Sequence, residues 1–253
     1  MPIVSDPWFY IMAIPAVLIY GIGKGGLGGA LGIIAVPLMA LIISPTQAAA
    51  ILLPILIVMD AFAVRHHYKN ADYRILKQML PGSILGVVLA GLFLSVTPET
   101  GLKLTIGLLS LAFCFQHWFG GRQSSSTPGK FSAWFWSALG GFSSTAIHAG
   151  GGPASIYLLP LRLEKVTLIA TMAVLFAIIN VVKVVPYVAL GEFDETNLLT
   201  ALLLIPFAPV GVKLGVMLLH KVSQERIYQL CYAFLFLSGA KLCFDAIQSF
   251  ALV

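Results

Sequence analysis

Two glycine-rich clusters, each beside a side chain that can carry positive charge or a proton, are the residues best suited to chemistry in this sequence. The first occupies residues 23–29 and contains Lys24, and the second occupies residues 149–153 and follows His148. Glycine frees the backbone to turn, and a helix that starts directly after such a turn presents free N–H groups and the positive end of its dipole. Two such helix ends facing each other would bind an anion.

The candidate binding residues belong to these clusters or lead into the second one. In chain order they are Lys24, Gly25, Gly26, Gly28, Gly29, Ser144, Thr145, His148, Gly150, Gly151 and Gly152. Three plainer interpretations stay open: the glycines serve close helix packing, Lys24 lies in a loop without a special role, and the hydroxyl groups bond back to their own helix. His148 is equally compatible with a neutral, hydrogen-bonded place in the core.

Three ionisable residues inside apolar segments are candidates for proton coupling: His148, Asp60 and Lys183. An ionisable group at membrane depth is costly and therefore indicates function, and the ordinary pKa of histidine, about 6.5, suits proton exchange. Asp60 and Lys183 lie 123 positions apart. The topology predicted below places them toward opposite faces of the membrane, so we expect no direct contact between them. Each either faces the transport path or bonds to a neighbouring helix.

The composition defines the setting of these residues. Hydrophobic residues make up 59% of the 253 residues and charged residues 10%, and the mean hydropathy is +0.96. So few charges cannot cover the surface of a soluble domain of this size. Several apolar segments approach or exceed the roughly 20 residues that cross a bilayer as a helix, and the alternating strands of a membrane barrel are absent. The sequence predicts an all-α integral membrane protein with 8–10 membrane segments.

Other classes of function lack their motifs. Cys114, Cys231 and Cys243 lie in apolar segments without metal-binding spacing, and no phosphate-binding GxxxxGK[ST] loop occurs. No basic run with interleaved aromatic residues indicates nucleic-acid binding.

We expect no catalytic residue, metal or cofactor, and as partners a small anion and the lipid bilayer. Whether the protein is a monomer or a homodimer stays open. Lys241 and Asp245, four residues apart, are expected to neutralise each other.

The apolar segments fall into two similar halves. A shift of about 123 positions lays Gly28-Gly29 on Gly151-Gly152 and Pro37 on Pro160. We therefore predict a first membrane repeat at residues 1–120, a cytoplasmic linker at 121–130 and a second repeat at 131–253. The predicted segments are 8–23, 29–43, 46–64, 73–95 and 100–119 in the first half, and 131–147, 153–163, 166–190, 197–219 and 226–250 in the second.

Charge placement predicts that the two halves are inverted. The loop at residues 65–77 is strongly basic, whereas the corresponding loop at residues 191–195 is acidic. Basic loops prefer the cytoplasmic side, so equivalent loops lie on opposite faces. This requires residues 131–163 to enter and leave on one side as a glycine-broken hairpin of short helices. By equivalence residues 8–43 form such a hairpin too, and both termini lie outside. Short interrupted helices at matching positions are typical of transporter binding sites.

The glycine motifs resemble those of a known family. Residues 25–29, Gly-Gly-Leu-Gly-Gly, followed by Val36-Pro37, and residues 150–153, Gly-Gly-Gly-Pro, followed by Leu159-Pro160, resemble the sulfite exporter TauE/SafE family over essentially the whole chain. The resemblance implies a secondary transporter of a small sulfur-containing anion, such as sulfite, thiosulfate or an organosulfonate, coupled to the proton gradient in a bacterial inner membrane. Members are usually described with seven or eight spans, fewer than the ten segments found here.

Two other functions are compatible with the same residues. An anion channel would use the same helix ends without alternating access, and would show large conductance where a coupled carrier shows saturation and proton dependence. An intramembrane enzyme would use Ser143 or Ser144 with His148, but no third catalytic group is apparent. The sequence fixes neither the direction of transport nor the particular anion.

Overall fold

The computed structural model describes residues 3–26, 30–119, 129–218 and 224–251. Within them the chain forms helices and no strand, which confirms the predicted all-α class. The helices are α1 (Pro7–Gly26), α2 (Ala35–Met39), α3 (Pro45–His67), α4 (Tyr73–Val96), α5 (Glu99–Phe119), α6 (Lys130–Ile147), α7 (Gly151–Leu158), α8 (Lys165–Ala189), α9 (Glu195–Leu204), α10 (Phe207–Leu218) and α11 (Gln224–Ala251), with 3₁₀ turns η1 (Ala30–Ile34), η2 (Tyr68–Asn70) and η3 (Leu159–Leu161).

The lengths of these helices fit a multi-pass membrane protein. Among the described residues, six helices, α1, α3, α4, α5, α8 and α11, are long and apolar enough to cross a bilayer. The pair α9 and α10 would make a seventh span, bent by 42°. The bend replaces the continuous segment predicted at 197–219. Pro206 stands at the break, where it cannot donate the backbone hydrogen bond that would continue α9.

The first hairpin arm is longer than predicted. Helix α1 continues through the first glycines to Gly26 and is itself a candidate span, so Lys24 lies on a helix and not in a turn. Glycine weakens a helix by about 1 kcal/mol relative to alanine, but here it permits close packing. A Cβ on Gly25 would lie 2.2 Å from the carbonyl oxygen of Val212, and one on Gly21 would lie 2.9 Å from the backbone of Gly211. Helix α10 therefore approaches α1 closely along the stretch that the glycines keep free.

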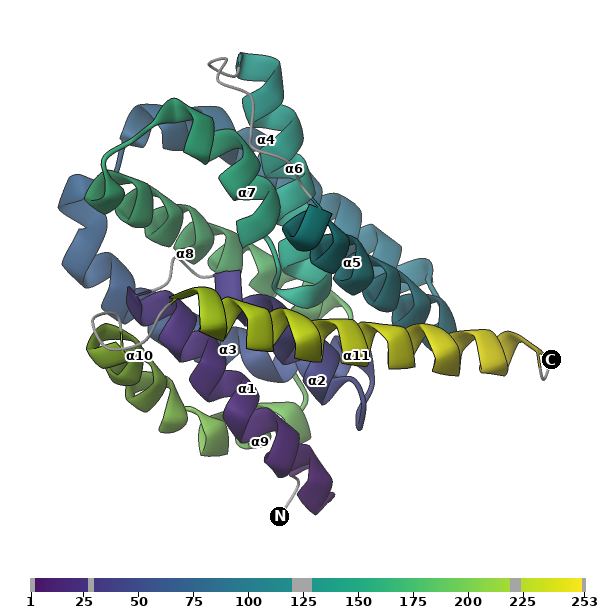
Figure 1. Cartoon of the computed structure of the whole chain (residues 1–253). Helices are drawn as coiled ribbons and strands as arrows, with labels where there is room; N and C mark the ends of the chain where they lie inside the picture. The colour runs from purple at the N-terminus through teal and green to yellow at the C-terminus, as the bar shows by residue number, and fades with distance from the viewer. Residues whose placement is uncertain (1–2, 27–29, 120–128, 219–223, 252–253) are drawn as a thin grey trace.

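The main helix pairs join the first part of the chain to the second. Helix α4 packs on α6, α1 on α10, α5 on α11, and α3 on α8. Figure 1 shows the resulting bundle, in which purple and blue helices alternate with green and yellow ones. Glycines make the first two contacts close, since a Cβ on Gly86 would reach the carbonyl oxygen of Ala138 and one on Gly211 that of Leu18. Helices of the two halves therefore pack against each other. The inverted repeat and the boundary at residues 121–130 stay predictions.

Helix α3 lies at the centre of the bundle and positions the middle of the candidate site. Its residues 48–53 are all buried, and it contacts α1, α5, α6, α8, α9 and α10. A helix that is apolar all round is stable only when surrounded. Ser44 caps its N-terminus by accepting a hydrogen bond from the Gln47 N–H, and Pro45 occupies the first turn.

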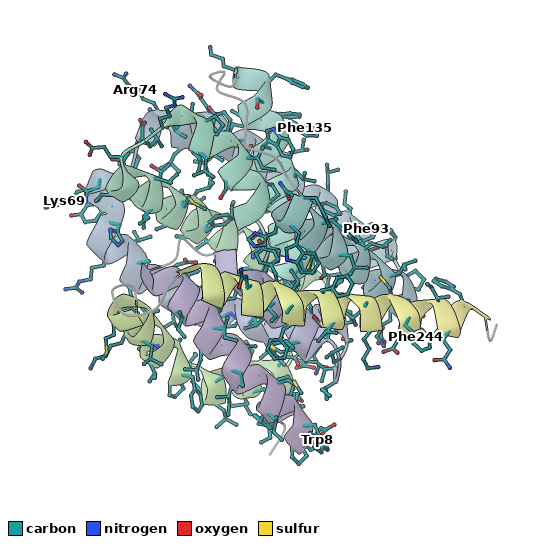
Figure 2. The ribbon with its side chains drawn as sticks, viewed as in Figure 1. Trp8, Lys69, Arg74, Phe93, Phe135 and Phe244 are labelled. Atoms are coloured by element: carbon teal, nitrogen blue, oxygen red, sulfur yellow. The ribbon has the colours of Figure 1, made fainter. Side chains whose placement is uncertain are left out.

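The basic and acidic loops lie at opposite ends of α3. At its C-terminal end, η2 contacts α8 and continues the basic loop. At its N-terminal end, the Gln47 side chain donates to Asn197, which itself donates to the carbonyl oxygen of Glu192 in the acidic loop. In Figure 2, Lys69 and Arg74 lie far from Trp8, near the N-terminus. This arrangement fits the predicted topology, whose sidedness stays a prediction.

Candidate functional site

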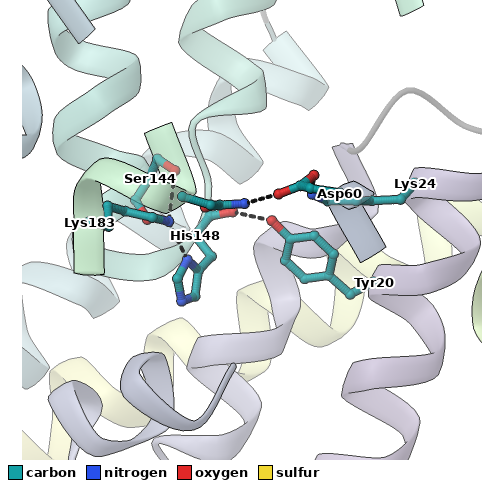
Figure 3. A network of polar contacts seen from close by, with 7 residues as sticks. Tyr20, Lys24, Asp60, Ser144, His148 and Lys183 are labelled. Carbon is teal, nitrogen blue, oxygen red and sulfur yellow. Dashed lines mark hydrogen bonds and ion pairs between the residues drawn. The ribbon is translucent and has the colours of Figure 1, made fainter. Parts of the chain in front are cut away.

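An ion pair between Lys24 and Asp60 joins α1 to α3 (Figure 3). Lys24 lies in the last turns of α1, and Asp60 is 3% exposed in the second half of α3. The second carboxylate oxygen of Asp60 accepts a hydrogen bond from the Asn180 amide of α8. A buried carboxylate is tolerated when it is paired and hydrogen-bonded, and Asp60 meets both conditions. Three helices from both halves of the chain therefore meet at one carboxylate.

His148 ends α6 in an unusual backbone conformation. Its φ is +54°, in the left-handed region that few residues other than glycine adopt, although histidine is more tolerant of it than most. The N–H of His148 bonds to the carbonyl of Ser144, and the N–H of Ala149 to that of Ser143. These two bonds form the helix-ending pattern that usually places glycine at the left-handed position. The chain turns sharply here, and α7 begins three residues later at Gly151.

The imidazole of His148 bridges α3 and α8. Its Nε2 lies 2.8 Å from the carbonyl oxygen of Ala49, and its Nδ1 lies 2.6 Å from the Nζ of Lys183. Because a carbonyl oxygen only accepts, Nε2 carries the hydrogen. Nδ1 then accepts from Lys183. This pattern is that of a neutral imidazole.

Lys183 is completely buried and caps the C-terminal end of α6. Besides His148, its Nζ donates to the carbonyl oxygen of Ser144 at 2.9 Å and to the Ser144 hydroxyl at 3.2 Å. Three acceptors match the three N–H bonds of an ammonium group. One turn further along α8, the Tyr187 hydroxyl donates to the carbonyl oxygen of Thr145 at 2.6 Å. The last carbonyls of a helix lack partners within it and attract cations, so this part of the network also stabilises the fold.

Tyr20 lies between the Lys24–Asp60 ion pair and the group formed by His148 and Lys183. Its hydroxyl donates to the carbonyl oxygen of His148 at 3.0 Å, and the Lys24 ammonium lies 5.8 Å from the centre of its ring. The buried network of the described residues thus contains two lysines, Lys24 and Lys183, and one carboxylate, which is bound to Lys24. Basic groups therefore outnumber carboxylates in the network. A centre of this composition is suited to an anion.

Two pockets meet at Lys24. Both are lined by Lys24, Ala63 and His67, and both extend along α3 toward the basic loop. The first also contains Asp60, Ile169, Met172, Ala173 and Phe176, and the second Gly25, Met59, Phe62, Pro209, Val212 and Lys213. The Lys24–Asp60 pair is therefore accessible from the pockets, whereas Lys183 lies enclosed behind it.

The predicted site residues separate into two groups. Lys24, Asp60, His148, Lys183 and Ser144 come together in the network of Figure 3. We expected no direct contact between Asp60 and Lys183. Each of them indeed bonds to other partners, Asp60 to Asn180 and Lys183 to Ser144.

The glycines and hydroxyl groups follow the plainer interpretations more closely. A Cβ on Gly150 would lie 2.6 Å from the carbonyl oxygen of Gly140, so this glycine, like Gly25, permits close packing. Thr145 bonds back to the carbonyl oxygen of Gly141. The left-handed residue at the second tip is His148 and none of Gly150, Gly151 and Gly152. Gly26 ends α1, Gly151 begins α7, and Gly28 and Gly29 lie outside the described residues.

Three residues of the network were missed from the sequence: Tyr20, Asn180 and Tyr187. A signal existed in α8, where Asn180, Lys183 and Tyr187 recur at helical spacing inside an apolar segment and so share one face. For Tyr20, the spacing of four residues from Lys24 was the only indication. A tyrosine in an apolar helix is common, so its hydrogen bond to a distant carbonyl could not be foreseen.

A multi-pass helical protein with a buried, charged centre accessible from a pocket has the architecture of a membrane transporter. The sequence model of the sulfite exporter TauE/SafE family matches residues 13–242. The chain belongs to this family, which is a family of membrane transporters and not a class of enzymes. No curated protein and no solved structure matches the chain.

Proposed function

We propose that this protein is a secondary transporter of a small sulfur-containing anion, namely sulfite, thiosulfate or an organosulfonate, driven by the proton gradient across a bacterial inner membrane. Its family and its membrane-spanning helices support transport of a sulfur-containing anion. The sequence has no nucleotide-binding loop that would supply energy by hydrolysis. An ion gradient is therefore the energy source that we assign.

The observation that carries this proposal is the position of Lys24 where the two pockets meet, paired with a buried carboxylate. An anion that enters either pocket competes with Asp60 for the Lys24 ammonium. Once displaced, Asp60 would keep only the Asn180 amide as a partner, and an unpaired buried carboxylate is strongly unfavourable. Asp60 then takes up a proton. Anion binding and proton binding are coupled in this way, and the pair crosses together.

The second glycine tip would take over the anion deeper in the protein. Phe176 lines the first pocket, and its ring also lies against Gly150, since a Cβ there would be 2.6 Å from the ring. A rotation of this side chain would connect the pocket with the N-terminus of α7, whose free N–H groups are suited to an anion. We assign the matching role in the first half to the N–H groups near Gly28 and Gly29. The anion would then be held between two half-helix N-termini near mid-membrane.

Reconstitution into liposomes tests the proposal. Uptake of radiolabelled sulfite, thiosulfate and a sulfonate is measured with and without a pH gradient, for the parent and for Asp60→Asn. We expect saturable uptake that the gradient stimulates in the parent. In Asp60→Asn, counterflow of the anion should persist while the stimulation disappears. Gradient-stimulated uptake by Asp60→Asn equal to that of the parent would remove Asp60 from the coupling, and failure of all three anions would refute the substrate class.

An anion channel is the second candidate. It needs a continuous aqueous path, and the basic side chains of the network would suit one. Lys183 is 0% exposed, however, and its three N–H bonds are used within the protein. This enclosure favours alternating access over a permanently open pore. Conductance that rises linearly with anion concentration in planar bilayers would favour the channel.

A further inference from the structure

We infer that Lys183 and His148 form a second anion-binding position, which opens toward the acidic-loop end of the bundle when the pockets at Lys24 close. The acidic-loop end is the end that carries the loop at residues 191–195. The inference rests on the proposed transport of an anion and adds where the anion is bound on the far side. Lys183 has no part in the coupling proposed above, although it is completely buried among polar partners in the second half of α8.

The bond between His148 and Lys183 matches the bond between Lys24 and Asp60 (Figure 3). His148 follows Lys24 by 124 positions and Lys183 follows Asp60 by 123 positions, which is the offset of the predicted repeat. Lys24 lies in the last turn of α1, and His148 ends α6. Their partners lie on α3 and α8, the two helices that pack on each other at the centre of the site. The two pairs therefore occupy corresponding places in the two predicted halves.

Each pair is also bonded to a helix of the opposite half. The Asn180 amide of α8 donates to Asp60, and the His148 imidazole donates to the carbonyl oxygen of Ala49 in α3. In the proposed coupling, Asn180 would hold the carboxylate while Lys24 exchanges its partner. By the same arrangement, the Ala49 carbonyl would hold the imidazole while Lys183 exchanges its partner.

Lys183 differs from Lys24 in the partners that it has. Lys24 is paired with a carboxylate, whereas the three acceptors of Lys183 are an imidazole, a carbonyl and a hydroxyl group, and none of these three carries a negative charge. A buried lysine that bears its proton needs a counter-charge. An anion bound in place of the imidazole would supply one, and the Ser144 hydroxyl, which accepts from Lys183, would have its hydrogen free to donate to the same anion.

The pocket beside Lys24 and Asp60 has a closed counterpart beside Lys183. The first pocket lies between the second half of α3 and the first half of α8, at Ala63, Met172, Ala173 and Phe176. The repeat offset carries these positions to the second half of α8 and the first half of α3, at Pro186, Ala49, Ala50 and Leu53. The three α3 residues of this counterpart are at most 1% exposed. One pair reaches a pocket while the other is enclosed, as is expected when two inverted halves open one at a time.

Polar contacts close the acidic-loop end in this structure. The Gln47 side chain donates to Asn197 at 2.8 Å and joins the first turn of α3 to α9. The Tyr187 hydroxyl donates to the Thr145 carbonyl at 2.6 Å and joins α8 to α6. Both contacts lie on the acidic-loop side of Lys183, because Tyr187 is one turn further along α8 and Gln47 is at the start of α3. Opening of this end would separate them and expose Lys183.

Thiol labelling tests the second opening without any anion. Ala173→Cys lines the first pocket, Ala50→Cys is its buried counterpart, and Ala90→Cys on α4 is an equally buried control, each made with Cys231 changed to serine. A small charged thiol reagent that does not cross membranes is applied to intact cells and to inverted vesicles. Ala173→Cys and Ala50→Cys should react from opposite sides, and Ala90→Cys from neither. Reaction of the first two from one side, or no reaction at Ala50→Cys, overturns the inference.

Side-specific uptake tests whether the opened position binds the anion. Uptake of radiolabelled sulfite, thiosulfate and ethanesulfonate is measured in right-side-out and inverted vesicles. Lys183→Met should raise the half-saturating concentration about 10- to 100-fold only for uptake from the acidic-loop end, and Lys24→Met only from the opposite end, since each loses a hydrogen bond to a charged group. Tyr187→Phe, which removes a neighbouring buried hydrogen bond but no amine, is the control and should stay within about twofold of the parent on both sides.

The outcomes separate this inference from the proposed function. A parent that takes up none of the three anions refutes the proposed function, and the inference with it. A parent that transports normally, with a Lys183→Met variant that changes both ends alike or neither, leaves the proposed function standing and overturns the inference, because Lys183 is then only the cap of α6. The labelling result still decides the question if Lys183→Met fails to fold.

Discussion

At the scale of single residues, the transport mechanism proposed above depends on how the Asp60 carboxylate shares its partners. Asp60 is bound by Lys24 on the side of the pockets and by Asn180 on the other. The first partner can be reached by an anion, and the second cannot be replaced by one. In the proposed mechanism Asn180 is therefore a positioning residue, which would keep the carboxylate in place while Lys24 changes partners.

We predict that Lys24 contributes charge to anion binding, and two substitutions separate its charge from its packing. Lys24→Arg should keep much of the affinity for sulfite, whereas Lys24→Met, of similar length, should weaken it about 10- to 100-fold. A hydrogen bond to a charged group contributes about 1.5–3 kcal/mol, which gives this range. Affinity is measured by isothermal titration calorimetry in detergent.

The Lys24→Met variant also leaves Asp60 unpaired, so its stability must be separated from its affinity. The double variant Lys24→Met with Asp60→Asn removes both charges and should recover the melting temperature that Lys24→Met loses. It should not recover sulfite binding. If Lys24→Met binds within twofold of the parent, Lys24 is a structural partner of Asp60 and the site lies elsewhere.

The sequence identified the charged residues of this network but not their bonds. Lys24, Asp60, His148 and Lys183 were found because an ionisable residue in an apolar segment is rare and expensive. Which of them pair depends on the rotation of α3 against α8 and on where α6 ends. Those are results of packing over the whole bundle. The left-handed backbone conformation of His148 was not predicted, because the adjacent glycines were the more obvious candidates for it.

At the scale of helices, the glycines at the turn between α6 and α7 have different structural roles. Gly150 lies against Gly140 and Ser144, so Gly150→Ala should lower the melting temperature of the protein in detergent. Gly151 begins α7, where the free N–H groups are. Gly151→Ala should therefore weaken anion binding while the protein stays monodisperse. Gly86→Ala, which would bring a methyl group against the Ala138 carbonyl and not onto the N-terminus of α7, is the control for packing damage alone. Normal binding by Gly151→Ala would make all these glycines packing residues.

The loop between α8 and α9 should make stability depend on pH. Partial burial raises the pKa of Glu192 above its ordinary value, with a smaller rise from Asp194, while a hydrogen bond from Thr46 opposes it. A carboxyl whose pKa is raised by folding stabilises the fold at low pH and loses that contribution as the pH rises through the folded-state pKa. Glu192→Gln should remove this loss. Its melting temperature should exceed that of the parent more at pH 8 than at pH 4. An equal difference at both pH values would contradict the assignment.

The helices themselves were predictable where apolar periodicity was long and uninterrupted. The expected segments at 46–64 and 73–95 lie within α3 and α4, and the one at 166–190 matches α8 except for its last residue. The glycine-rich end of α1 and the break at Pro206 were not predictable, because both depend on neighbours. Glycine ends a helix in water, but against α10 it permits a contact that keeps the helix intact. Pro81 lies within a continuous α4, whereas Pro206 separates α9 from α10.

At the scale of the whole molecule, the packing of the helices is reciprocal. Helix α4 of the first half packs on α6 of the second, and α10 of the second half packs on α1 of the first. Helices α3 and α8 pack on each other, as do α5 and α11. Two halves related by a two-fold axis would produce this exchange, because equivalent helices then have equivalent partners. The pattern supports the predicted repeat, and an axis in the membrane plane would make the repeat inverted.

Sidedness provides the test of that axis. The basic end of α3 at η2 and the acidic loop that begins α9 lie at opposite ends of the bundle. The excess of lysine and arginine at η2 predicts that this end lies in the cytoplasm. The exposed residues Lys69 and Glu195 are each replaced by cysteine, with Cys231 changed to serine, and are labelled with a membrane-impermeant maleimide. Intact cells should label only Glu195→Cys, and inverted vesicles only Lys69→Cys. Labelling of both from one side would mean that residues 69 and 195 lie on the same face of the membrane. The inverted repeat would then be excluded, and with it the placement of two half-helix N-termini around one anion.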